Sequence, residues 1–199
     1  MDFTRGIAKN PDADESTPDP FAHVQAATRQ HLKEHGCGAY TFEDGRALIR
    51  LAQERQPKRV LELGTGLGYT ACCFAYGSPD SRVDTIEGDR EHVELAREQI
   101  EKCDLGERIF VHHGEFDTVL KTLRAGYDFI FFDGFEPTFE IVMQMRELLV
   151  EGGLLICGNL QISSGTEATQ LADELADVSH WKSCDPIENG CTAVLIKQS

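Results

Sequence analysis

The chain has few basic residues and lacks any long apolar run. Only 19 Lys and Arg stand against 34 Asp and Glu among 199 residues, which gives a formal net charge of −15. A field of this sign repels phosphate backbones and anionic lipid, so neither nucleic acid nor a membrane surface is expected as a partner. Because no stretch of about 18 apolar residues occurs, no transmembrane helix is expected either.

Paired cysteines and a signal peptide are also missing. The seven cysteines are an odd number, and none belongs to a Cys-x-x-Cys pair. The first residues, 1–16, contain no apolar core of signal-peptide length. Both features are typical of a protein that stays in a reducing compartment, which predicts a cytoplasmic location.

What the chain does have is enough apolar residues for one core. Hydrophobic residues make up 41% of the sequence, and the length suits a single domain. Residues 1–18 are polar and hold several Asp and Pro, which predicts a flexible acidic tail. We expect residues 19–199 to form one domain, with N-terminal helices over 19–56 and the core over 57–199.

Two helices are expected before the core. Asp19 followed by Pro20 resembles an N-cap with proline at the first helical position, and this helix would end at Gly36. Thr41 would open the second helix, because Asp44 three residues later gives a start like a capping box.

From residue 57 on, short apolar segments alternate with helical ones. The expected strands are 59–63, 82–87, 108–113, 127–133 and 152–158, and the expected helices are 69–77, 89–106, 115–126, one from Pro137, and 167–176. The end of the chain instead carries two strand-like runs around "ENG", which indicates a hairpin. The pattern predicts a doubly wound, Rossmann-like α/β fold: a mostly parallel seven-stranded sheet with a C-terminal antiparallel hairpin.

Acidic residues gather after several of these strands. Glu62 lies in the first strand, Glu87 ends the second, Glu115 follows the third, and Asp133 ends the fourth. In open α/β sheets, ligands bind beyond the carboxyl ends of the strands. We therefore expect one acidic binding edge.

The loop after the first strand carries Gly64, Gly66 and Gly68. A dinucleotide fingerprint needs its third glycine one residue later, where Tyr69 stands here. Glu62 would also place a negative charge near two phosphates. A nicotinamide dinucleotide is therefore disfavoured.

S-adenosylmethionine suits this loop better, because it carries a positive sulfonium and a positive ammonium and has no phosphate. Glycines let the backbone approach its amino-acid end. Glu87 lies 21 residues after Gly66, where an acid at the end of the second strand can accept the ribose hydroxyls. A structural glycine turn with chance acids is the competing interpretation.

From about residue 37 to the end, the chain resembles class I S-adenosylmethionine-dependent methyltransferases, and more narrowly the small O-methyltransferases of the catechol and caffeoyl-CoA type. The stretches that carry the resemblance are "TFEDGRALIRLAQERQPKRVLELGTGLGYT", "YDFIFFD", "EGGLLICGN" and "DPIENGCTAVLIK". The resemblance implies methyl transfer from S-adenosylmethionine to a small-molecule acceptor, with oxygen as the acceptor atom. A metal-independent enzyme acting on an N, S or C acceptor, and a non-catalytic S-adenosylmethionine-binding protein, are the alternatives.

The resemblance also implies residue roles. Glu62 and Thr70 would contact the methionine part and Glu87 the ribose, while Gly114 and Glu115 would border the adenine. The full set implied for the cofactor is Tyr40, Glu62, Gly64, Gly66, Gly68, Tyr69, Thr70, Glu87, Gly114, Glu115, Phe116 and Asp133. By analogy with relatives that pair through their N-terminal helices, a homodimer is expected.

The family's catalytic corner is only partly kept. Its members bind a divalent cation through an Asp after the fourth strand and an Asp-Asn pair after the fifth, and use a Lys as general base. Here Asp133 and Asn159 are present, but Gly158 replaces one Asp and Glu136 replaces the Lys. The resemblance thus implies Asp133 and Glu136 as catalytic residues, with Asp133 and Asn159 as metal ligands.

Three interpretations of this corner stay open. A cation such as Mg²⁺ binds through Asp133, Asn159 and Glu136 with water; or no metal binds and Glu136 or a nearby His takes the proton; or the protein holds the cofactor and does little chemistry.

His31 and His35 lie four residues apart on the first expected helix. This spacing can hold a metal ion. With no third ligand in view, we interpret the two side chains as part of a solvated helix face.

Overall fold

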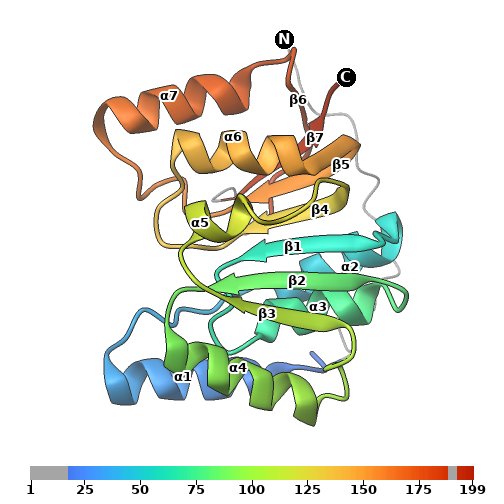
Figure 1. Cartoon of the computed structure of the whole chain (residues 1–199), viewed down its shortest axis with the longest axis vertical. Helices are drawn as coiled ribbons and strands as arrows, with labels where there is room; N and C mark the ends of the chain where they lie inside the picture. Colours follow the sequence, from blue (N-terminus) through green and yellow to red (C-terminus); the bar gives the residue numbers. More distant parts are fainter. Residues whose placement is uncertain (1–17, 188–191) are drawn as a thin grey trace.

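The computed structural model describes residues 18–187 and 192–199. A seven-stranded sheet with the strand order β3-β2-β1-β4-β5-β7-β6 lies between two layers of helices (Figure 1). The strands are β1 (Arg59–Leu63), β2 (Arg82–Glu87), β3 (Ile109–His113), β4 (Tyr127–Phe132), β5 (Leu149–Cys157), β6 (Trp181–Ser183) and β7 (Ala193–Lys197).

The sheet confirms the predicted fold class. Strands β1 to β5 pair in parallel. Strand β7 is antiparallel to both β5 and β6, which is the predicted C-terminal hairpin. Its "ENG" turn lies outside the described residues, as does the predicted tail apart from Pro18.

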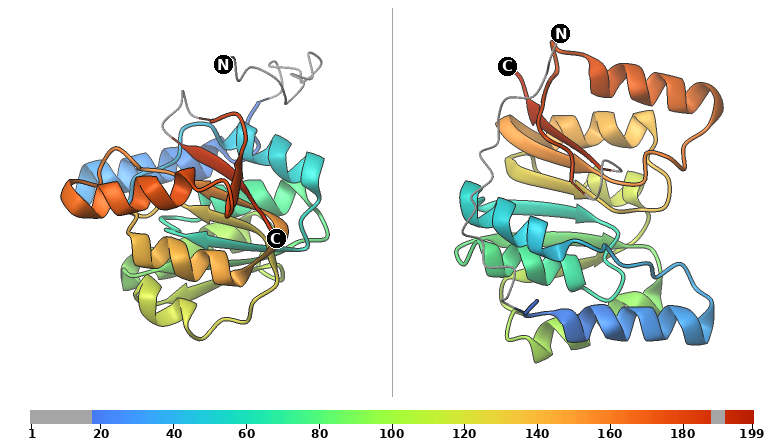
Figure 2. Two further views of the ribbon diagram at one scale, coloured as in Figure 1. Left: turned by 90° about the horizontal axis from the view of Figure 1, so that it is seen from above. Right: turned by 180° about the vertical axis from the view of Figure 1, so that it is seen from behind.

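The helices divide between the two faces of the sheet, as Figure 2 shows from two further sides. Helices α1 (Ala22–His35), α2 (Gly45–Arg55), α3 (Tyr69–Gly77) and α4 (Arg90–Lys102) pack on one face. Helices α5 (Phe116–Leu120), α6 (Phe139–Leu148) and α7 (Gly165–Ala176) pack on the other. The parallel part of the sheet is therefore covered on both sides.

The central strand β4 shows why its sequence is almost entirely apolar, with Asp128 as the exception near its start. Phe129 and Phe131 belong to the core under α1–α4, whereas Ile130 and Phe132 belong to the core under α5–α7. Successive side chains of a strand point to opposite faces, so the part of a strand that is covered on both faces is apolar at successive positions.

Both N-terminal helices begin later than predicted. The carboxylate of Asp44 accepts a hydrogen bond from the Ala47 N–H (3.0 Å), so Asp44 is the N-cap of α2, and the predicted start at Thr41 is wrong. Helix α1 begins at Ala22 rather than at Pro20. The Asp19 carboxylate accepts from the Phe21 N–H (2.8 Å) in the turn before the helix, so it lies two residues ahead of the N-cap position, which Phe21 occupies.

Several boundaries in the core also differ. Helix α4 ends at Lys102 rather than at 106, and strand β5 begins at Leu149 rather than at 152. Helix α5 covers only Phe116–Leu120 instead of 115–126. The chain then continues in tight turns, with the Thr122 N–H bonded to the Val119 carbonyl, before it enters β4. Helix α6 begins at Phe139, because the hydroxyl of Thr138 accepts from the Ile141 N–H and caps it, rather than at Pro137.

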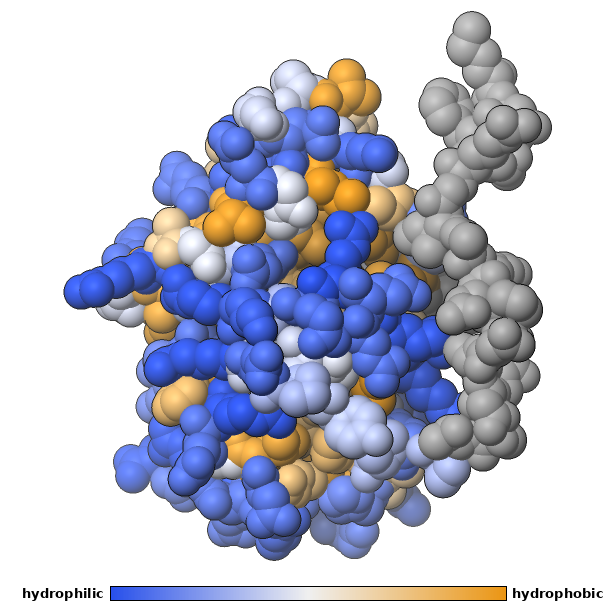
Figure 3. All heavy atoms as spheres, turned by 90° about the vertical axis from the view of Figure 1, so that its right-hand side faces the viewer, coloured by the Kyte–Doolittle hydropathy of each residue, from blue (hydrophilic) through white to orange (hydrophobic). Residues whose placement is uncertain are grey.

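The edge at the amino ends of the parallel strands carries mostly hydrophilic side chains, with scattered apolar ones (Figure 3). In the described part of the chain, no helix combines the length and the apolarity that a bilayer crossing requires.

Candidate functional site

A pocket of about 630 Å³ opens at the carboxyl ends of the parallel strands. Loops after all five of them contribute to it, together with α1 and residues 38–42 ahead of α2. This is the edge that the sequence predicts. The lining includes ten of the predicted cofactor residues: Tyr40, Gly64, Gly66, Tyr69, Thr70, Glu87, Gly114, Glu115, Phe116 and Asp133.

The glycine loop follows β1 at the carboxyl edge of the sheet, where the strand order reverses between β1 and β4. Gly64 has φ +97°, and a Cβ there would lie 2.8 Å from the carbonyl oxygen of Asp133. Only glycine fits both the left-handed backbone and this close approach. The absence of a side chain therefore brings the loops after β1 and β4 into contact at the pocket floor.

Glu62 lies beneath this loop and is fully buried, so it does not line the pocket. Its carboxylate accepts hydrogen bonds from the hydroxyls of Thr70 and Thr85, the latter at 2.6 Å. Burial raises the pKa of Glu62 to about 7, although the two hydroxyls act in the opposite direction. Glu62 thus fixes Thr70, which does line the pocket.

Glu87 holds two loops together at the pocket wall. One carboxylate oxygen accepts from the Gly66 N–H (2.9 Å), and the other accepts from the Asp89 N–H (3.0 Å). The second oxygen also lies 3.8 Å from Nδ1 of His92. Glu87 therefore places a negative charge at the pocket while it orders the glycine loop and the start of α4.

The far wall comes from the loop after β3. Gly114 has φ +151°, and Phe116 packs edge-on against Phe132 with ring centroids 5.9 Å apart. A Cβ on Gly134 would lie 2.6 Å from the Phe116 ring, so this glycine leaves room for the aromatic wall. The predicted residues 114–116 are thus brought together on one side of the pocket.

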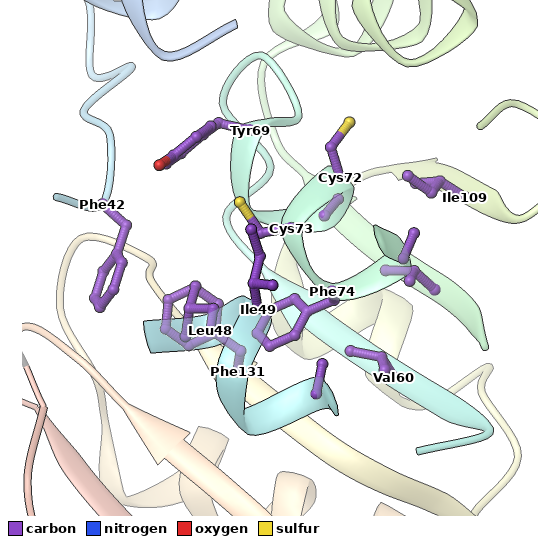
Figure 4. Packing of buried hydrophobic residues seen from close by; sticks show 14 of the residues in the cluster. Phe42, Leu48, Ile49, Val60, Tyr69, Cys72, Cys73, Phe74, Ile109 and Phe131 are labelled. Atoms are coloured by element: carbon purple, nitrogen blue, oxygen red, sulfur yellow. The ribbon is translucent and has the colours of Figure 1, made fainter. Parts of the chain in front are cut away.

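The two predicted tyrosines are placed differently. Tyr69 is buried, and its hydroxyl donates to the Asp19 carboxylate; in Figure 4 its ring extends away from α3. Burial raises the pKa of Tyr69 above its ordinary value. Tyr40 is 71% exposed at the pocket mouth. Gly68, the remaining predicted residue, is the N-cap of α3 and is not part of the lining.

Sequence reasoning missed several lining residues, among them Thr28, Thr41 and His92. The Thr41 hydroxyl is buried and has no hydrogen-bond partner within the described chain. A buried polar group without a partner is costly, so this atom points to a ligand group. Thr41 is a polar residue shortly before α2, but the sequence pattern favours a helix start with Thr41 as its cap, so Thr41 was not predicted to line the pocket.

The corner after β4 and β5 holds a single carboxylate at the pocket. Asp133 lines the pocket, and the amide nitrogen of Asn159 donates to the Gly134 carbonyl (2.7 Å). Gly158 brings no oxygen ligand from a side chain, and Glu136 is exposed and not part of the lining. Since Mg²⁺ is held by several oxygen ligands, this corner fits the cation poorly.

His31 does not lie on a solvated helix face as predicted. Its side chain is buried, whereas His35 next to it is exposed. The reason is that α4 packs beside α1 and brings the His92 ring to within 5.2 Å of the His31 ring, centroid to centroid.

Comparison with characterised sequences shows two similar catechol O-methyltransferases. The one from Mycobacterium tuberculosis is 31% identical over 129 residues, which are 64% of this chain and 59% of that protein. The one from Niastella koreensis is 32% identical over 146 residues, 70% of this chain and 66% of that protein. The match therefore spans less than two thirds of the length of either relative.

Solved structures show the same fold. The SAH-bound methyltransferase PaMTH1 of Podospora anserina superimposes with a TM-score of 0.78 at 20% identity, over 92% of this chain and 89% of that one. The O-methyltransferase TomG of Streptomyces achromogenes, in complex with SAM, gives 0.75 at 22% identity over 88% and 90%.

The family model described as O-methyltransferase matches residues 20–175, which include α1 to α6, the parallel strands and all of α7 except its last residue. The pocket edge described above lies within this range. The chain therefore belongs to the O-methyltransferase family.

Proposed function

We propose that this protein is an S-adenosylmethionine-dependent O-methyltransferase that acts on a small molecule. The observation that carries the proposal is the charge of the glycine-loop pocket. Glu87 binds the loop through the Gly66 N–H, and Glu115 and Asp133 line the same pocket. An acidic loop opposes a pyrophosphate and favours a positively charged donor. Membership of the O-methyltransferase family supports the same activity.

The residues present fit the donor. Gly66 leaves the pocket side of the loop open, since a Cβ there would meet nothing closer than 3.5 Å. The hydroxyls of Thr41 and Thr70 would bind the amino-acid part, and Glu87 would accept from the ribose. Residues 114–116 would border the adenine. The unpartnered Thr41 hydroxyl supports this arrangement most specifically, because a ligand would satisfy it.

S-adenosylmethionine would supply an electrophilic methyl group to the acceptor. Asp133 lies at the pocket floor where the strand order reverses, and we assign it the orientation of the acceptor hydroxyl and the acceptance of its proton. Glu136 remains a predicted catalytic residue; its exposure, outside the lining, gives it no defined contact with the pocket.

Two exposed aromatic rings suggest the class of acceptor. Phe135 is 73% exposed and Tyr40 is 71% exposed, and both line the pocket. Exposed rings at a pocket mouth can stack on a planar partner. We propose an aromatic hydroxyl compound as the acceptor.

Positioning alone can carry such a reaction. A phenol with a pKa of about 10 is ionised to roughly one part in a thousand at pH 7, which costs about 4 kcal/mol. Alignment of two reactants can lower a barrier by about 7–11 kcal/mol. Because the corner at Asp133 offers a single carboxylate, we propose transfer without a divalent cation at that corner.

The test is transfer of a labelled methyl group from S-adenosylmethionine to a panel of catechols and hydroxycinnamates. The proposal expects labelled methyl ethers both with chelator and with Mg²⁺. Binding of S-adenosylhomocysteine without product from any acceptor would overturn the enzymatic assignment. Activity lost in chelator and restored by Mg²⁺, but not by Zn²⁺, would overturn the metal-free assignment. The homodimer, the cytoplasmic location and the exclusion of nucleic acid stay predictions.

A further inference from the structure

Three potential metal ligands meet beside the pocket, on the side away from Asp133. They are His31 on α1, Cys37 just after α1, and His92 on α4. One ligand atom from each lies within 4.8 Å of the other two. The helices α1 and α4 run side by side, as Figures 1 and 2 both show. None of the three residues belongs to the predicted metal site at Asp133 and Asn159.

The fold positions each ligand by ordinary means. Helix α1 ends at Gly36, whose left-handed backbone (φ +62°) turns the chain so that Cys37 lies next to the helix it has just left. His92 lies in the first turn of α4, where Asp89 caps the helix by accepting from the His92 N–H. The His31 ring packs edge-on against the His92 ring.

The cluster is sheltered without being closed. His31 and His92 are buried, and Cys37 is partly exposed. A second group of potential ligands shares His31 and lies on the outer side; it adds the exposed His35 and Glu91. The His35 ring stacks on His31 with a centroid distance of 4.4 Å. An ion could therefore enter from solvent past His35.

We propose that His31, Cys37 and His92 form a binding site for a late first-row divalent cation, with Zn²⁺ as the natural occupant. Two imidazoles and one thiolate are the ligand types that Zn²⁺ prefers, and a water would fill the fourth position. Ligand atoms around a tetrahedral zinc lie about 3.3–3.8 Å apart. The three ligand atoms lie within 4.8 Å of one another, so a zinc site needs at most about 1 to 1.5 Å of closure, which small rotations of the three side chains can provide.

The surrounding charge favours a cation. The Glu87 carboxylate lies 3.8 Å from His92 Nδ1, and the exposed Glu91 belongs to the outer group. The whole chain carries a net charge of −15. An ion bound here would also fix the chain next to Cys37, where Gly38 and Tyr40 line the pocket. An ion at this site would thus link α1, α4 and the segment at the pocket mouth.

The test is a Co²⁺ titration of the reduced, tag-free full chain, followed by competition with Zn²⁺. Co²⁺ reports its ligands through tetrahedral visible bands and a thiolate charge-transfer band. We expect one ion per chain, both bands, and their loss when Zn²⁺ is added. Cys37→Ser should remove the charge-transfer band and lower the affinity by more than about 100-fold, beyond the 10–100-fold typical of an outer contact.

Two further variants separate ligation from folding. Cys103→Ser is the matched control, since Cys103 is also a partly buried thiol beside a histidine, His23 at 3.7 Å; it should leave both bands unchanged. In His31→Gln, the charge-transfer band should remain but become weaker, because Cys37 still binds the ion. The visible bands of tetrahedral Co²⁺ should lose intensity, because one imidazole ligand is missing. The proposal is overturned if the wild-type chain shows no charge-transfer band, or if Cys103→Ser removes it and Cys37→Ser does not. Neither readout depends on methyl transfer.

Discussion

At the scale of single residues, the buried acid Glu62 is the most unusual group in the molecule. Glu62 lies in strand β1. Among the described residues, the partners of its carboxylate are two threonine hydroxyls and no cationic side chain. Burial raises its pKa to about 7, and the charge of Glu87 acts in the same direction. The group is therefore protonated in the folded chain over a pH range where an unfolded chain has lost the proton.

This shift makes stability fall as the pH rises. Between pH 4.5 and about 7 the folded state retains a proton that the unfolded state releases, so the free energy of unfolding decreases through that window and levels off above it. The total is about 3 kcal/mol. Glu62→Gln should match the wild type near pH 5 and be more stable than it at pH 8, as measured by urea unfolding.

The control for this prediction is Glu98→Gln, which alters an exposed acid on α4. Its stability relative to the wild type should not change with pH. If the difference between Glu62→Gln and the wild type is the same at pH 5 and pH 8, Glu62 does not titrate as described.

Glu87 provides a second test at this scale. In Glu87→Gln, the side-chain NH₂ group replaces one of the two carboxylate oxygens. An NH₂ group cannot accept a hydrogen bond, so the variant loses the bond from either the Gly66 N–H or the Asp89 N–H. Hydrogen bonds to charged groups are worth about 1.5–3 kcal/mol, so the dissociation constant for S-adenosylhomocysteine should rise about 10- to 100-fold. Calorimetry measures it, and Glu94→Gln, an exposed change on α4, should leave it unaltered. If Glu87→Gln and Glu94→Gln bind S-adenosylhomocysteine with the same affinity, Glu87 does not contribute to the binding site.

At the scale of elements, the approach of the β1 and β4 loops is the feature that shapes the pocket floor. In Gly64→Ala, the new methyl group would lie 2.8 Å from the Asp133 carbonyl at φ +97°. Backbone strain of this kind costs about 1–3 kcal/mol, and the steric clash adds to it. We expect reduced stability in urea and weaker binding of S-adenosylhomocysteine.

Gly152→Ala separates the two effects. Its φ is +75°, but a Cβ there would meet nothing within 4 Å. Gly152→Ala should therefore be destabilised by backbone strain alone, and it should keep the ligand affinity of the wild type. A Gly64→Ala protein as stable as Gly152→Ala would show that the two loops do not press together as described.

The elements also show where sequence reasoning succeeds and fails. Strand β4 could be placed because its apolar run over residues 129–132 has one physical explanation, burial on both faces. The start of α2 could not, because a short acid such as Asp44 serves equally as an N-cap or within the first turn. Local pattern alone does not decide between the two, and the surrounding packing does.

The candidate site shows the same limit over longer distances. Glu87 could be predicted because it ends the strand next to the glycine loop in a known order. Thr41 and His92 could not, because their places in the pocket depend on how residues 38–42 and α4 pack, which no periodicity encodes. The meeting of His31 and His92, 61 positions apart in the sequence, is of the same kind.

At the scale of the whole molecule, Gly158 distinguishes this chain from a two-carboxylate metal site. A Cβ there would lie 3.6 Å from an Asp133 carboxylate oxygen and 3.1 Å from the Phe132 carbonyl oxygen. Gly158→Asp therefore needs a shift of a few tenths of an ångström at Phe132, and it places a second carboxylate beside Asp133. We expect Mn²⁺ binding at this corner, followed by electron paramagnetic resonance, in Gly158→Asp and not in the wild type. Equal Mn²⁺ binding in Gly158→Asp and Gly158→Asp/Asp133→Asn would contradict it.

The proposed function depends on an acidic, glycine-lined pocket that accepts a cationic methyl donor and rejects a pyrophosphate. The most direct measurement is calorimetric titration of the full chain with S-adenosylmethionine, S-adenosylhomocysteine and NAD⁺ at matched concentrations. We predict single-site binding of the first two and no heat of binding from NAD⁺. Binding of NAD⁺ with none of either S-adenosyl compound would contradict the central claim.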